Sequence, residues 1–180
     1  MSKILTIDYE TSDSRVNFGQ VLQAGIVISD DKLNIQSRHE LRCRLKPTVI
    51  PSIGACLVHK IPVNILKNSN KSHYEMVLEH YNLIKDNTPS VVMGFNQVAF
   101  DIEFYRRMLY KSLIPDVYQT NTNGNRHLDI LNVSRAAKFA DNDSIQTILN
   151  EKNRDSFKLA DLSTANKINN GTSHDAITDC

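Results

Sequence analysis

Near the N-terminus the sequence reads Lys3-Ile4-Leu5-Thr6-Ile7-Asp8-Tyr9-Glu10. The apolar residues of this stretch favour a β-strand, and two acids follow them. Side chains in a strand alternate between its faces, so Asp8 and Glu10 should present their carboxylates side by side. Carboxylates this close repel each other unless one is protonated or a cation lies between them. Their hard oxygen atoms suit Mg²⁺ or Mn²⁺. The alternative is that both acids simply end the strand in solvent and bind no metal.

The composition bounds the class of protein. At 180 residues we expect one domain, and the net charge of +1 means that any nucleic-acid surface must be a local patch. No apolar run approaches the ~20 residues that span a membrane, and the N-terminus carries no signal sequence. Cys43, Cys56 and Cys180 lack C-x-x-C spacing, which favours free thiols in a reducing cytoplasm over a disulfide or a zinc site. We therefore expect a cytoplasmic protein, and a monomer.

The remaining pattern predicts alternating elements. Strand-like runs cover residues 21–29, 35–45 and 91–96, and the first two continue the opening strand as an antiparallel meander. Helical spacing covers residues 74–84, 99–109, 157–168 and 173–180. Residues 47–72 form a long connection of the kind that is functional or holds short helices. Residues 128–139 should begin as a short strand and become a helix, with these residues buried: Leu128, Ile130, Leu131 and Val133. This order predicts an α/β domain with a mixed, five-stranded sheet flanked by helices.

Further acids and one histidine follow other predicted elements. Asp101 opens the helix after strand 91–96, and His174 and Asp179 lie in the last segment. Together with Asp8 and Glu10, Asp101 and Asp179 make four acids from three segments of the chain. Two divalent ions about 3.5–4 Å apart need several such carboxylates and can stabilise both oxygens of phosphodiester cleavage. The histidine would then be a general base. Taken alone, Asp101 also fits a helix-start acid, and His174 a surface residue.

The spacing of the last two residues makes a geometric demand. Five positions of an ideal helix turn by about 500°, which leaves His174 and Asp179 roughly 140° apart. They converge only if His174 lies on the entry or the first turn of the helix, with Ser173 or Thr172 as its cap.

Three motifs carry a family resemblance. They are Asp8-Tyr9-Glu10-Thr11, Gly94-Phe95-Asn96-Gln97-Val98-Ala99-Phe100-Asp101 and His174-Asp175-Ala176-Ile177-Thr178-Asp179. In this order they resemble the exonuclease motifs of the DEDD superfamily, in its histidine-bearing (DEDDh) branch, and among these the bacterial exonuclease I family most. Further likeness lies in Leu128-Asp129-Ile130-Leu131 and in Ser156-Phe157-Lys158-Leu159.

The resemblance implies an RNase H-like fold and metal-dependent 3′→5′ hydrolysis of single-stranded DNA to 5′-mononucleotides. It implies that two Mg²⁺ ions, replaceable by Mn²⁺, are held by Asp8, Glu10, Asp101 and Asp179, with His174 as the base. The substrate would be contacted by Glu10, Thr11 and Lys158. A lysine at position 158 can bind a phosphate as a point charge, but it lacks the bidentate geometry that an arginine would have. By the same analogy, single-stranded DNA-binding protein is a partner. Short RNA, a proofreading role and an inactive nucleic-acid-binding remnant are the alternatives.

Two departures from the family pattern stand out. The accessory domains of exonuclease I are not in this sequence, and the sequence stops one residue after Asp179. We therefore expect residues 1–180 to be an exonuclease domain truncated at its C-terminus.

Several other residues have weaker claims to function. His59 lies in a segment similar to the V-H-G-I loop of proofreading exonucleases, but an ordinary loop histidine is the favoured interpretation. For Asp129 a structural role is favoured over metal binding. Arg106, Arg107 and Lys111 fit a solvated helix face, although attraction to a nucleic-acid backbone would use such residues. The remaining histidines are expected to be ordinary, and Phe100 and Tyr105 to be core residues rather than platforms for bases.

Overall fold

The computed structural model describes residues 3–168 and 175–180. Its central sheet has five strands in the order β3-β2-β1-β4-β5. Their bounds are β1 Lys3–Thr11, β2 Val21–Ser29, β3 Ile35–Arg42, β4 Ser90–Gly94 and β5 Arg126–Asp129. β1, β2 and β3 pair antiparallel, whereas β4 and β5 join them in parallel. The predicted mixed sheet with its antiparallel meander is confirmed.

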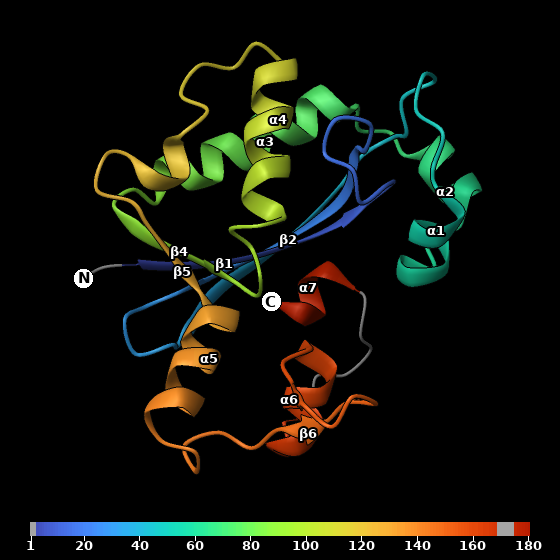
Figure 1. Ribbon diagram of the computed structural model, residues 1–180. Coiled ribbons are helices and arrows are strands. Elements are labelled where there is room, and N and C mark those ends of the chain that lie inside the picture. Colours follow the sequence, from blue (N-terminus) through green and yellow to red (C-terminus); the bar gives the residue numbers. More distant parts are fainter. Residues whose placement is uncertain (1–2, 169–174) are drawn as a thin grey trace.

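Helices cover both faces of this sheet (Figure 1). Their bounds are α1 Ile53–His59, α2 Val63–Asn68, α3 His73–Asp86, α4 Asp101–Lys111, α5 Ile130–Ala140, α6 Leu159–Ala165 and α7 Ala176–Asp179. A 3₁₀-helix η1, Gln119–Asn121, precedes β5, and a small hairpin of β6, Ile148–Leu149, and β7, Asp155–Ser156, precedes α6. None of the helices in residues 3–168 and 175–180 is long and apolar enough to cross a bilayer.

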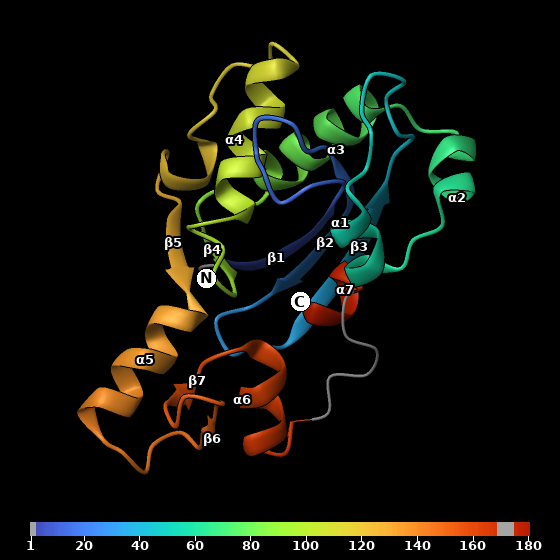
Figure 2. The same ribbon diagram turned by 45° about the vertical axis from the view of Figure 1, so that its right-hand side comes forward.

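The main core lies between the sheet and α3 and α4. Buried side chains of β1 and β2 meet those of the two helices, among them Ile7, Ile26, Met76, Ile102 and Leu109. Figures 1 and 2 show α7 on the opposite face of the sheet, with α5, α6 and the hairpin extending beyond it. The two faces of β1 therefore have different roles: one packs in the core and the other faces α7.

Most helices and strands lie where the sequence predicts them, but several of their ends differ from the predicted bounds. β2 has the predicted bounds, the 47–72 connection holds α1 and α2, and residues 128–139 do change from strand to helix. The predicted third strand is too long, since pairing ends at Arg42. The predicted helix 157–168 is also too long, because α6 covers only Leu159–Ala165. α7 covers residues 176–179, and residues 173 and 174 of the predicted last helix lie outside the described residues.

One prediction about burial is wrong. Leu128 is 39% exposed and Val133 is 44% exposed, whereas Leu131 is buried as expected. β5 is the edge strand of the sheet, and α5 leaves that edge, so one side of each meets no neighbouring layer. Ile130 is only partly buried for the same reason.

A buried histidine makes the core sensitive to acid. His80 is fully buried and its Nε2 lies 2.9 Å from the hydroxyl of Tyr9; burial lowers its pKa to about 3. Between pH 6.5 and 3 the unfolded chain takes up a proton at this position that the folded chain does not, so stability falls as pH falls. We expect this group to remove about 2 kcal/mol between pH 7 and pH 5.

Urea unfolding of the wild type and of His80→Gln at both pH values measures this contribution. The difference in unfolding free energy between the two proteins should shrink by that amount at pH 5. A difference that does not change with pH would show that His80 takes up its proton as readily in the folded chain as in the unfolded chain.

Candidate active site

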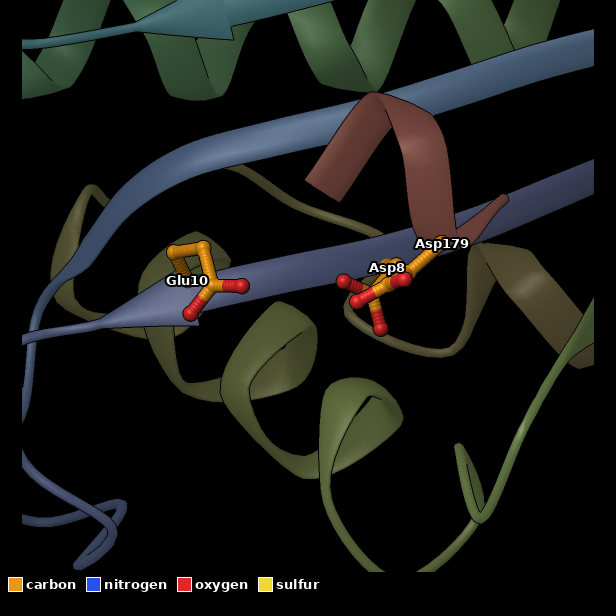
Figure 3. A group of neighbouring side chains, drawn as sticks. All are labelled: Asp8, Glu10 and Asp179. Carbon is orange, nitrogen blue, oxygen red and sulfur yellow. The ribbon is translucent and has the colours of Figure 1, made fainter. Parts of the chain in front are cut away.

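The alternation of β1 separates its core residues from its acids. Leu5, Ile7 and Tyr9 are buried against α3 and α4, and the Tyr9 hydroxyl meets His80 of α3. Asp8 and Glu10 lie on the other face, as their spacing predicts. Figure 3 shows the two side chains on β1, with Asp179 reaching toward Asp8 from α7.

α7 reaches β1 because the neighbouring strand offers no side chain in its path. Gly25 of β2 is paired with Asp8, and a Cβ atom on it would lie only 2.1 Å from the carbonyl oxygen of Ala176. Two residues earlier on the same face, the Gln23 amide donates to Asp175 Oδ1 at 2.6 Å. Asp175 precedes α7, and its backbone carbonyl accepts from the Asp179 NH at 3.0 Å. Gly25 and Gln23 therefore fix α7 on the sheet.

The resulting cluster joins three carboxylates from two segments. Asp8, Glu10 and Asp179 each offer an oxygen atom, and these atoms all lie within 4.8 Å of one another. Burial, followed by the charges of Asp179 and Asp175, raises the pKa of Asp8 to about 7. Burial and the charge of Asp8 raise the pKa of Glu10 to about 8. A bound cation would relieve this repulsion, so the donor set fits a divalent metal ion.

Asp101 lies beside this cluster at the start of α4. Its side chain is 3% exposed, and its Oδ1 has no hydrogen-bond partner in the described part of the chain. Its pKa is raised well above the ordinary value, by burial first and then by the charge of Asp8. A buried carboxylate oxygen without a partner is costly, and a cation would satisfy it.

The acids line a cleft of about 530 Å³. Its walls include backbone or side chains of Thr11, Asn96, Phe100 and Leu159, and the helix α1 borders it. The Thr11 hydroxyl donates to the carbonyl oxygen of Asp13 at 3.0 Å. Lys158 is exposed at the position preceding α6, next to Leu159, and does not itself line the cleft. His174 lies outside the described residues.

His59 and Asp129 have different environments. His59 is 5% exposed and lines the cleft; its Nδ1 accepts from the Ile61 NH at 2.9 Å, whereas its Nε2 has no partner among the described residues. Asp129 accepts from the backbone NH groups of Asn96 and Leu131, at 2.9 and 3.1 Å. It thus caps α5 and holds the loop before α4, which agrees with the structural role favoured from the sequence.

Four residues at the site were not predicted from the sequence. Gln23 and Gly25 lie at a spacing of two on a strand, and this shared face was the available signal. Asp175 stands within a quoted motif but was assigned no role. The Cys180 thiol lies close enough to Asp8 and Asp101 for their charges, with burial, to raise its pKa.

The five-stranded mixed sheet with its flanking helices is that of an RNase H-like domain, and its acidic cluster is a candidate metal site. No family model matches the chain. It is 28% identical over 176 residues to exodeoxyribonuclease I of Buchnera aphidicola subsp. Acyrthosiphon pisum, an alignment that covers 97% of this chain and 42% of the relative. The chain therefore spans less than half the length of the curated relatives it matches first.

Solved structures give the same result. The crystal structure of E. coli exonuclease I in complex with a dT13 oligonucleotide matches with a TM-score of 0.92 and 25% identity, over 99% of this chain and 39% of that one. The zinc-ion-bound form of the E. coli enzyme with single-stranded DNA matches with a TM-score of 0.91, 25% identity and coverage of 99% and 38%. Over nearly its whole length the chain is thus similar to exonuclease I in sequence and fold, and the resemblance seen in its motifs is confirmed.

Proposed function

We propose that this chain is the catalytic domain of a metal-dependent 3′→5′ exonuclease that degrades single-stranded DNA to 5′-mononucleotides. The observation that carries the proposal is the cluster of Asp8, Glu10 and Asp179 in the lining of a cleft. Asp101 lines the same cleft, and its Oδ1 has no hydrogen-bond partner among the described residues. Two of the matched E. coli structures are complexes with a dT13 oligonucleotide and with single-stranded DNA, which supports this substrate.

The proposed cofactor is a pair of Mg²⁺ ions, for which Mn²⁺ can substitute. Asp8, Glu10, Asp101 and Asp179 would hold them. When bound, divalent ions supply positive charge at the scissile phosphate, where negative charge develops. All four acids contribute oxygen donors only, which suits such hard cations.

The residues of the chain have separate proposed roles. Glu10 and Thr11 line the cleft and would contact the terminal nucleotide, and Lys158 would meet a phosphate from the edge of the cleft. His174 would accept the proton of the attacking water. The apolar walls formed by Phe100 and Leu159 would exclude bulk water from the carboxylates, which strengthens electrostatic interactions inside the cleft.

The proposed setting follows the same analogy. All three cysteines are free thiols, which supports a reducing, cytoplasmic compartment. One matched structure is described as a complex of ExoI with SSB-Ct, and we propose single-stranded DNA-binding protein as a partner here too.

A comparison of DNA and RNA tests the substrate. Labelled single-stranded DNA and RNA of one sequence are incubated with the protein and Mg²⁺, with EDTA as the control. We expect mononucleotides from DNA in the Mg²⁺ sample only. Faster release from RNA would transfer the same chemistry to RNA, and binding of DNA without any release would favour the inactive remnant.

His174→Ala tests the proposed base. Loss of a general base should lower the rate by a factor on the order of 10²–10⁴ and leave divalent-ion affinity nearly unchanged. Single-turnover kinetics and calorimetric titration with Mn²⁺ measure the two quantities. If His174→Ala loses affinity for the ion as severely as Asp179→Ala does, the histidine is a ligand and not the base.

A further inference from the structure

A second, basic pocket lies across the β1–β2 loop from the acidic cleft. Ser14 of this loop lines the cleft, whereas Gly19 lines the second pocket, whose volume is about 180 Å³. The basic groups lining it come from three parts of the chain. They are Lys46, after β3; His73, the first residue of α3; and Arg107 and Lys111, on α4.

These cations are not neutralised by the protein. Across residues 3–168 and 175–180, no carboxylate forms an ion pair with Lys46, Arg107 or Lys111. Lys111 donates to a backbone carbonyl, that of Asn17, at 2.9 Å. Mutual repulsion is therefore left in place: the charges of Lys46 and Arg107 add to burial in lowering the pKa of Lys111.

Acids close to the pocket along the chain are engaged elsewhere. Glu103 of α4 pairs with Arg106 at 2.7 Å and does not line the pocket. Asp13, in the same loop, accepts two hydrogen bonds from the Arg15 guanidinium, at 2.9 and 2.7 Å. Glu75, in the first turn of α3, accepts from the Ser72 NH at 2.7 Å and completes the cap of that helix. None of these carboxylates is part of the lining of the pocket, so its field is positive.

The wall of this pocket contains an unsatisfied polar group. His73 is 6% exposed, and its Nδ1 has no hydrogen-bond partner in the described part of the chain. Burial, and then the charges of Lys46 and Lys111, lower its pKa to about 4. A buried polar atom without a partner is destabilising, and an anion beside three cations and an imidazole would relieve both the repulsion and this deficit.

We propose that the basic pocket binds a backbone phosphate of the single strand whose 3′ end lies in the acidic cleft. The inference rests on the proposed function, because it takes the substrate to be a nucleic acid strand. Among the described residues no lysine or arginine lines the cleft, and Lys158 lies only at its edge, so further cations for the upstream backbone must come from another surface.

The position of the pocket along α4 sets the nucleotide that it would reach. Arg107 and Lys111 lie six and ten residues after Asp101, which is about 9 and 15 Å along the helix. At ~3.4 Å for each nucleotide of a stacked strand, this corresponds to roughly three to four nucleotides upstream of the scissile bond.

An exposed aromatic ring at the pocket offers a platform for a base. Phe18 lines the pocket and is 68% exposed, and the Arg15 guanidinium lies 5.0 Å from its ring centroid. An aromatic face beside uncompensated cations is the combination that binds single strands without sequence preference. A free phosphate ion could bind the cations, but it has no base that could stack on the ring.

The test compares a long and a short oligonucleotide. Lys46→Gln/Arg107→Gln is compared with the wild type and with Lys32→Gln/Lys152→Gln, which removes the same charge from two exposed positions away from both pockets. Affinity for labelled dT12 is measured by fluorescence anisotropy in EDTA at several salt concentrations, and hydrolysis of dT12 and dT2 is measured in Mg²⁺.

We expect the pocket variant to bind dT12 about tenfold more weakly, as the loss of charge-assisted contacts implies. The slope of log K against log salt should fall by about 1.4 for two lost phosphate contacts. The rise in KM should be confined to dT12, with kcat unchanged, and the control variant should match the wild type.

Two results would overturn the proposal. One is an affinity for dT12 that is the same in the pocket variant and the wild type. If inorganic phosphate then raises the melting temperature of the wild type but not of the variant, the pocket holds a free anion and not the strand. The other is an equal loss for dT12 and dT2. If neither the wild type nor the variants hydrolyse either substrate, the proposed function is wrong. The binding of dT12 measured by anisotropy in EDTA still tests the basic pocket in that case.

Discussion

Asp8→Asn should reduce nucleotide release by a factor of about 10³ or more and at the same time stabilise the metal-free protein. Asp8 has a carboxylate oxygen within 4.8 Å of one of Glu10 and one of Asp179, and its charge also acts on Asp101. An amide keeps the shape of the side chain but removes the charge that a divalent ion needs. Removal of one electrostatic contact to the developing charge already costs 10²–10³ in other enzymes.

The gain in stability has a definite pH dependence. The pKa of Asp8 is about 7, raised mainly by burial, so the folded metal-free chain binds this proton more tightly than the unfolded chain. Its stabilising contribution is present below pH ~4 and is lost as pH rises toward 7. At pH 8 we expect Asp8→Asn to melt about 3 °C or more above the wild type in EDTA, the shift that ~1 kcal/mol produces in a domain of this size.

Differential scanning fluorimetry with EDTA and with Mg²⁺ measures this effect. The advantage of the variant should disappear at pH 4, and added Mg²⁺ should raise the melting temperature of the wild type alone. A variant that releases nucleotides at a nearly normal rate would remove Asp8 from the active site.

Gly25→Ala should lower turnover by about 10²-fold although residue 25 has no side chain to react. A Cβ atom there would lie 2.1 Å from the Ala176 carbonyl oxygen and 2.7 Å from the Ile177 nitrogen. Both are backbone atoms, so no rotation of a side chain relieves the contact and α7 must move. Asp179 moves with it, and a misplacement of about 1 Å can cost this factor in rate.

The matched control is Gly54→Ala. A Cβ at Gly54, within α1, meets nothing within 4 Å, and the change should stabilise the chain by about 0.4–1 kcal/mol. Turnover, Mn²⁺ affinity and unfolding free energy are measured for Gly25→Ala, and the stability of the control shows what the same change does without a clash. Wild-type turnover and Mn²⁺ affinity in Gly25→Ala would mean that α7 does not need its present position.

Features that depend on short-range patterns could be predicted from the sequence. The period of two in β1 separates Asp8 and Glu10 from the core, and this required only the alternation of the strand. Asp101 follows a buried parallel strand, where the ends of strands gather side chains at one edge of a sheet. Asp179 could be assigned from the motif resemblance, but its approach to Asp8 depends on Gly25 and Gln23, which are about 150 residues away in sequence.

Packing between distant segments accounts for what could not be predicted. Leu128 was expected to be buried because it is apolar and lies in a strand, but burial at the sheet edge depends on which layer covers it. The basic pocket brings together Lys46, His73 and two residues of α4, which come from three parts of the chain that no sequence pattern connects. For Arg107 and Lys111 the solvated-face interpretation was favoured, and the absence of a carboxylate partner became visible only in the described fold.

We propose that the acidic cleft removes nucleotides from the 3′ end of a single strand with the help of divalent ions. This activity is tested by a time course with a 20-nucleotide DNA that is labelled at its 5′ end and resolved to single nucleotides. With Mg²⁺ the account predicts a descending ladder of labelled fragments, each one nucleotide shorter, which is absent with EDTA and with Asp8→Asn. Immediate release of a labelled mononucleotide, cleavage at internal positions only, or an intact strand would contradict it.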